Sequence, residues 1–131
     1  MADHDDRQAR ARLLRQTVIA ALYFVQDVLR GLPIPVEIPD PFEGDELNPE
    51  AILALNRARS VIADEPIRDR AKKAYDDLIL NWLIAYELMV IASIGGPAPW
   101  RLDACEYSLN GLAVLAEMIE TDDLGEDDEQ D

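Results

Sequence analysis

The spacing of apolar residues constrains this chain most, because along most of its length they recur every three or four positions. That spacing gathers them on one side of an α-helix, and no alternating strand pattern occurs outside one proline-rich segment. The pattern predicts four helices, over residues 6–30, 49–63, 66–93 and 99–121. We therefore expect an all-α fold, a four-helix bundle-like single domain.

The first two helices are joined by a long proline-rich extended connection, residues 31–48. Its prolines exclude helix and favour an extended backbone, and they are Pro33, Pro35, Pro39 and Pro41. The second helix should begin at Asn48-Pro49-Glu50, an N-cap followed by proline and an acid in the first turn. Two interpretations of the connection stay open: a strap across the bundle, or a recognition loop, since long loops often carry binding residues.

The helical stripes also predict a core. We expect the most buried residues to include Leu22, Val25, Leu78, Trp82, Met89, Leu109 and Leu112. Beyond Asp77 the third helix is apolar nearly all round, so its second half should be the central and most buried element. Glu87 interrupts that half, either as an exposed carboxylate or as a functional acid in a pocket.

Length, net charge and cysteine content limit the functions that this chain can have. The 131 residues fit one helical domain, 1–121, with a low-complexity acidic tail, 122–131. The formal net charge of −15 argues against direct binding to nucleic acid or to an anionic membrane surface. A single cysteine, Cys105, and the lack of a secretory signal pattern favour the cytoplasm.

Catalytic motifs are lacking in this sequence. The only histidine is His4, so neither the Glu-x-x-His metal motif nor a histidine-activated nucleophile can be built. The two adjacent glycines, Gly95 and Gly96, lack the flanking pattern of a nucleotide-binding loop. We expect no enzyme activity, no cofactor and no dedicated metal site.

The charges are segregated along the chain. Residues 31–56 hold six acids and no base, and residues 102–131 hold eleven acids and no base. Acids at the end of the fourth helix also oppose its dipole, by about 0.3–1 kcal/mol each. We expect the partner-binding residues among these acids: Glu37, Asp40, Glu43, Asp45 and Glu46 on the connection, and Glu117, Glu120, Asp122 and Asp123 at the end of the fourth helix.

Three explanations compete for this acidity. In an up-down-up-down bundle the first helix starts beside the end of the fourth, so basic side chains could neutralise the tail: Arg7, Arg10, Arg12 and Arg15. Alternatively, the acids bind a basic protein, such as a nucleic-acid-binding complex. In size, charge and expected helicity the chain resembles small acidic DNA mimics, including phage-encoded inhibitors of restriction and CRISPR systems, although it shares no motif with them. The third explanation is a helical adaptor, chaperone or immunity protein that binds through an apolar groove. The oligomeric state stays open.

Overall fold

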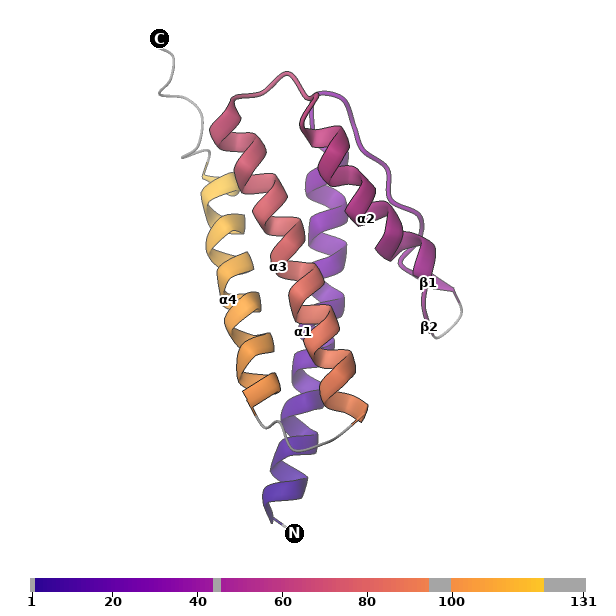
Figure 1. The fold of residues 1–131 in the computed structure, drawn as a ribbon, viewed down its shortest axis with the longest axis vertical. Coiled ribbons are helices and arrows are strands. Elements are labelled where there is room, and N and C mark those ends of the chain that lie inside the picture. The colour runs from indigo at the N-terminus through magenta and orange to yellow at the C-terminus, as the bar shows by residue number, and fades with distance from the viewer. Residues whose placement is uncertain (1, 44–45, 95–99, 122–131) are drawn as a thin grey trace.

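Four helices form this chain, seen here in a computed structural model that describes residues 2–43, 46–94 and 100–121 (Figure 1). They are α1 (Ala2–Arg30), α2 (Pro49–Ile62), α3 (Asp69–Ile94) and α4 (Trp100–Glu120). The all-α, bundle-like fold predicted from the apolar spacing is confirmed. α3 starts three residues later than predicted, because the Ile67 N–H bonds to the Glu65 carbonyl across Pro66, in a turn that precedes the helix.

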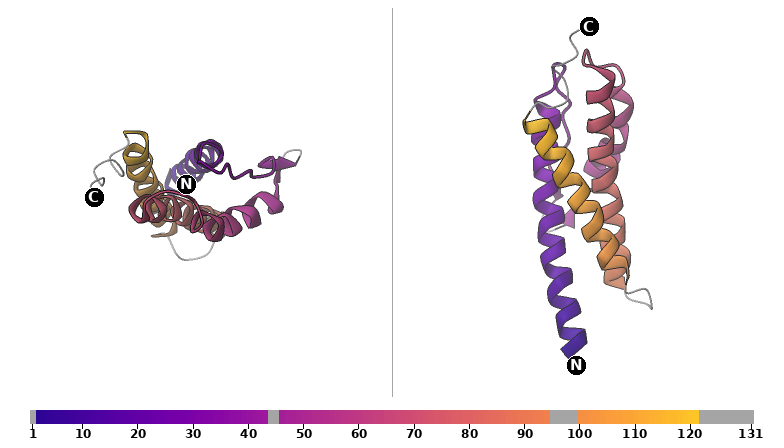
Figure 2. Two further views of the ribbon diagram at one scale, coloured as in Figure 1. Left: turned by 90° about the horizontal axis from the view of Figure 1, so that it is seen from above. Right: turned by 90° about the vertical axis from the view of Figure 1, so that its left-hand side faces the viewer.

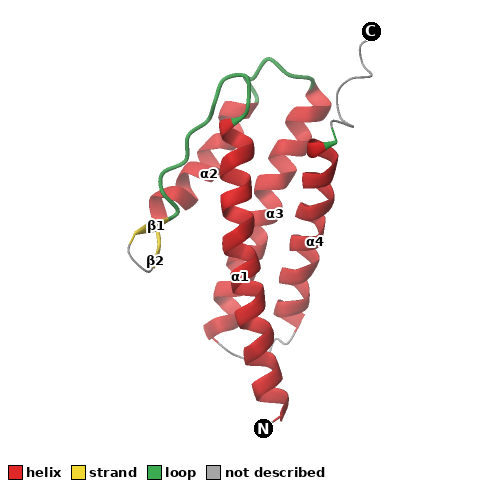
Figure 3. Ribbon diagram, turned by 180° about the vertical axis from the view of Figure 1, so that it is seen from behind, coloured by secondary structure: helices red, strands yellow, loops and turns green. Residues whose placement is uncertain are grey.

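The order of the helices differs from the expected up-down-up-down arrangement. α1 and α2 run in the same direction, α3 runs back, and α4 runs parallel to α1 (Figures 1 and 3). The cause is the connection between α1 and α2, which returns alongside the helices before α2 begins. An extended chain advances about 3.3 Å per residue, so about ten residues are enough for this return. The start of α1 therefore lies beside the start of α4, and the prediction that it lies beside the end of α4 is wrong.

Residues 31–41 contain no regular secondary structure and are fastened to α1 by backbone groups. The Val36 N–H donates to the Leu29 carbonyl at 3.0 Å, and the buried Gln26 amide donates to the Ile38 carbonyl at 3.1 Å. Ile38 is itself buried. These bonds hold one side of the connection against α1.

Two short strands follow, β1 (Phe42–Glu43) and β2 (Glu46–Leu47), paired antiparallel with Phe42 opposite Leu47. They were not predicted, because strands of two residues are too short to show an alternating pattern. Asn48 closes this hairpin and caps α2: its N–H donates to the Pro41 carbonyl at 2.8 Å, and its side chain accepts from the Glu50 N–H.

The core lies around α3. The Trp82 side chain is fully buried, donates from Nε1 to the Val18 carbonyl of α1 at 2.8 Å, and stacks on Tyr86. Every residue predicted for the core is buried except Met89, which is half-buried. Below the level of the Arg59–Asp76 ion pair, α2 diverges from α3, so the second half of α3 lacks α2 as a neighbour (Figure 1).

The second half of α3 is therefore packed mainly between α1 and α4, and the prediction that it is the most buried element is wrong. Ile84 and Ile91 are largely exposed there. Glu87 is also exposed, as the first of its two interpretations predicted.

Candidate functional site: the acidic surfaces

The acids of the connection lie beside α1 and α2. Glu37 is exposed, and its carboxylate is 3.4 Å from the Arg30 guanidinium of α1. Asp40 is exposed as well, and its carboxylate accepts the Phe42 N–H at 3.2 Å. Glu43 and Glu46 oppose each other in the β1–β2 pair, and Asp45 lies outside the described residues. In this group, then, one acid has a basic neighbour and one stabilises a turn.

The acids at the end of α4 have a different environment. Glu117 and Glu120 are both exposed, and no basic residue follows Arg101 in the sequence. The Thr121 hydroxyl donates to the Glu117 carbonyl at 2.9 Å, which satisfies one of the free carbonyls of the last turn. Asp122 and Asp123 lie outside the described residues.

The two groups do not form one surface. Viewed from above, α4 lies on one flank of the molecule and the connection with β1 and β2 lies on the other, with α1 and α3 between them (Figure 2). In this view the two acidic groups are separated by α1 and α3. The sequence could not reveal this separation, because it follows from the parallel course of α1 and α2.

Arg7, Arg10, Arg12 and Arg15, in the first half of α1, lie at the wrong end of the molecule to neutralise the end of α4. Arg10 is 2.7 Å from both Asp103 and Glu106, in the first two turns of α4. The hydrogen bonds that the Arg10 guanidinium donates, first to Asp103 and then to Glu106, raise its pKa. Arg7, Arg12 and Arg15 are exposed on the same half of α1, whereas α4 ends at the far end of the bundle (Figures 1 and 3).

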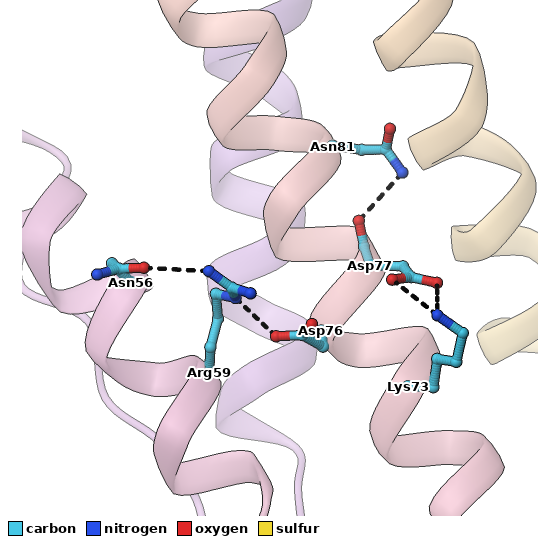
Figure 4. Close-up of polar contacts among 6 residues, drawn as sticks. All are labelled: Asn56, Arg59, Lys73, Asp76, Asp77 and Asn81. Atoms are coloured by element: carbon cyan, nitrogen blue, oxygen red, sulfur yellow. Dashed lines mark hydrogen bonds and ion pairs between the residues drawn. The ribbon is translucent and has the colours of Figure 1, made fainter.

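Other basic side chains pair within the helical body (Figure 4). Arg59 of α2 lies 2.7 Å from Asp76 of α3, and its guanidinium also donates to Asn56. The hydrogen bond with Asp76 raises the pKa of Arg59. Lys73 pairs with Asp77 one turn further along α3, at 3.2 Å. The first pair links α2 to α3, the second lies within α3, and both neutralise acids in the middle of the chain.

Two buried side chains, Cys105 and Glu65, are of types that can take part in catalysis. Each of them contacts the backbone of a neighbouring segment. Cys105 is fully buried, its thiol lies 3.4 Å from the Ala85 carbonyl, and burial raises the pKa of that thiol. Glu65 is only 3% exposed; one carboxylate oxygen accepts the Ile34 N–H at 3.0 Å, and the other has no partner among the described groups. In the sequence Glu65 is marked only by its place between two predicted helices, and nothing there indicates that it ties the connection to the α2–α3 turn.

Within the part of the chain that the structure describes, no group of three histidine, cysteine, aspartate or glutamate side chains is placed to hold a metal ion. None of the helices described here is long and apolar enough to cross a membrane. Comparison with protein-family models, with curated proteins and with solved structures found no match.

One feature of α4 was missed entirely. Trp100, Tyr107 and Val114 are exposed, large and apolar, and they follow one another at intervals of seven residues. Seven residues complete almost two helical turns, so the three side chains lie along one side of α4. The interval is visible in the sequence, but the stripe through Leu102, Cys105, Leu109 and Leu112 has equivalent spacing and was assigned to the core first.

Proposed function

We propose that this protein is a non-catalytic binding protein whose acidic α4 end occupies a basic, nucleic-acid-binding surface of a partner protein. The observation that supports this most is the position of Glu117 and Glu120. They lie at the end of α4 that is away from Arg7, Arg10, Arg12 and Arg15, with Asp122 and Asp123 next in the sequence.

The energetic cost of placing acids at this end of α4 also supports the proposal. Glutamates in the last turns of a helix face its negative dipole end, which costs about 0.3–1 kcal/mol each when exposed. The expected compensation from Arg7, Arg10, Arg12 and Arg15 is not available there, because Arg10 pairs with Asp103 and Glu106 at the other end of α4. A concentrated acidic cluster of this kind raises the association rate with a basic surface.

An acidic cluster gives such an interaction two measurable properties. Long-range attraction raises the association rate for a basic surface, and salt lowers that rate because the Debye length falls to about 8 Å at physiological ionic strength. Polyanions such as DNA also compete for the same surface. In this proposal the connection, with Glu37, Asp40, Glu43, Asp45 and Glu46, is a second and separate acidic region.

The test is capture from a bacterial lysate by the immobilised full chain, at low and at physiological salt, with mass spectrometry of the bound proteins. We expect basic, nucleic-acid-binding proteins that are released both by salt and by added duplex DNA. Two double variants locate the contact: Glu117→Gln/Glu120→Gln should weaken capture, and Glu37→Gln/Asp40→Asn, which removes the same charge from the other flank, should not.

Captured proteins without a basic surface, or capture that neither salt nor DNA affects, would contradict the proposal. Binding that resists salt would instead favour the adaptor alternative, in which apolar side chains make the contact.

A further inference from the structure

The α3–α4 pair carries an apolar face that no other described element covers. Cys105 of α4 lies against Ala85 of α3, and a Cβ at Gly111 would lie 3.3 Å from the Asn81 side chain. In an antiparallel pair, these two contacts place Tyr107 level with Ile84 and Trp100 level with Ile91.

These side chains point to the same side of the pair. Tyr107 and Ile84 each follow a buried core residue, Cys105 and Trp82, by two positions, which is about 200° around the helix. Trp82 faces α1, so Ile84 faces away from α1. This is the side of α3 and α4 that lies in front in Figure 1, with α1 behind them.

We call this surface the outer α3–α4 face. Its large apolar residues and their exposed fractions are Tyr107 80%, Trp100 63%, Val114 59%, Ile84 45% and Ile91 40%. Ala104 and Gly111 complete the stripe on α4, so that from residue 100 to residue 114 it advances by four, three, four and three. This is the spacing of a coiled-coil seam, and none of its positions is charged.

We infer that the outer α3–α4 face binds a second copy of this chain, in a two-fold symmetric homodimer. The first argument is symmetry. Trp100 and Val114 lie seven residues on either side of Tyr107. Two antiparallel copies therefore place Tyr107 against Tyr107 and the large Trp100 against the small Val114, and a two-fold interface requires such a self-complementary patch.

The second argument is area. Phe, Tyr and Trp side chains bury about 150–250 Å², and Val and Ile less, so the exposed parts of these five residues amount to roughly 400–600 Å² per copy. Two copies would bury roughly 800–1,200 Å² from these side chains alone, which reaches the lower limit for a specific interface. Ala104, a small residue of the same stripe, allows the two α4 helices to approach closely.

The third argument is charge. The chain carries a net charge of −15, so two copies repel each other over most of their surface. That repulsion is weakest along the uncharged α4 stripe, whereas on α3 the exposed Glu87 lies between Ile84 and Ile91. The dimer should therefore strengthen as salt rises, whereas binding through the acidic end of α4 should weaken. The inference does not depend on the proposed function, and this opposite salt response separates the failure of one from the failure of the other.

Sedimentation equilibrium of the full chain tests the inference. Between about 5 and about 300 µM protein, the mass should rise from that of one 14.7 kDa chain toward that of two. Raising NaCl from about 20 to about 300 mM should tighten the dimer. Tyr107→Glu should weaken it at least tenfold, because it places two carboxylates at the centre of the interface. Leu13→Glu is the matched control, because Leu13 is an exposed apolar residue of α1 away from the outer face.

A chain that stays monomeric over this range would overturn the inference, and so would a dimer that Tyr107→Glu leaves intact. Cross-linking provides a second readout that does not need a disruptive substitution. Tyr107→Cys should be joined to its partner copy by a short bismaleimide much faster than Leu13→Cys, with the wild-type chain, whose Cys105 is buried, as the blank. Equal rates for the two variants would also overturn it.

Discussion

The two apolar stripes of α4 have nearly the same spacing and opposite surroundings. The inner stripe, through Leu102, Cys105, Leu109 and Leu112, is buried against α1 and α3. The outer stripe, through Trp100, Tyr107 and Val114, is exposed. Periodicity therefore shows that a helix has an apolar side, but not which of two such sides faces the core of its own chain.

The same difference divides α3. Its first half is surrounded by α1, α2 and α4, whereas below the level of α2 its outer side has no covering helix (Figure 1). Even within the second half, Trp82 faces α1 and is fully buried, whereas Ile91 is 40% exposed. One helix thus supplies both the centre of the fold and half of a surface suited to association.

The largest expected effect compares neighbouring positions on the two stripes. Leu112→Ala removes a buried side chain and should lower the free energy of unfolding by about 2–5 kcal/mol. Val114→Ala, two residues on, should change it by less than about 0.5 kcal/mol. Urea titrations at low protein concentration, where association does not contribute, measure both. Equal losses would show that the two stripes are equally buried.

The second comparison uses the two tryptophans. Trp82→Phe loses the hydrogen bond to the Val18 carbonyl and part of a filled volume, so it should cost about 1–3 kcal/mol of stability. Trp100→Phe should leave the stability of the monomer nearly unchanged, because that side chain is exposed. Thermal unfolding by circular dichroism measures both, and a Trp100→Phe loss as large as that of Trp82→Phe would contradict the assignment.

Much of this contrast could be predicted from the sequence. Gly31 with the prolines after it, and Asn48 with Pro49, marked the helix ends that the structure shows. The core residues Leu22, Trp82 and Leu109 follow from spacing alone. The parallel course of α1 and α2 could not be predicted, because it depends on where the connection is fastened by Gln26 and Glu65.

The candidate site was predictable only in part. Glu117 and Glu120 were expected at the end of a helix, and they are there. Their distance from Arg10 follows from helix order, which the sequence does not encode locally. Met89 lies on the same stripe as Trp82 but is only half-buried, so the spacing predicted its side of α3 and overestimated its burial.

The third comparison concerns pH and the inner stripe. Burial raises the pKa of the Cys105 thiol above its unfolded value of about 8.5. The folded state therefore keeps the thiol proton up to a higher pH than the unfolded state does, so the free energy of unfolding falls as pH rises beyond about 8.5. The slope should reach up to about 1.4 kcal/mol per pH unit.

Cys105→Ala is the control for this titration. The variant lacks the thiol but keeps every other group that titrates in this range, so the difference between the two stability curves isolates Cys105. Parallel curves from pH 8 to 10 would show that the thiol is as accessible as in the unfolded chain.

The smallest expected effect on stability concerns the ion pairs of Arg10, which lie at the edge between the two apolar stripes of α4. Arg10→Met removes the ion pairs with Asp103 and Glu106, whose side chains are largely exposed, so it should cost only about 0.2–1 kcal/mol at low salt. Salt should erase the loss. Arg7→Met is the control without such a pair in the described structure. A loss that persists at high salt would mean that Arg10 acts through packing rather than through charge.

Acrylamide quenching of tryptophan fluorescence tests the central claim most directly, namely that the inner stripe faces the core and the outer stripe an interface. The full chain reports on Trp82 and Trp100 together, and Trp100→Phe reports on Trp82 alone, so their difference gives Trp100. Trp82 should be protected at every protein concentration. Trp100 should be readily quenched in dilute solution and become protected as concentration and salt increase. Trp100 that stays equally accessible at all concentrations, or Trp82 that is quenched as readily as Trp100, would contradict this account.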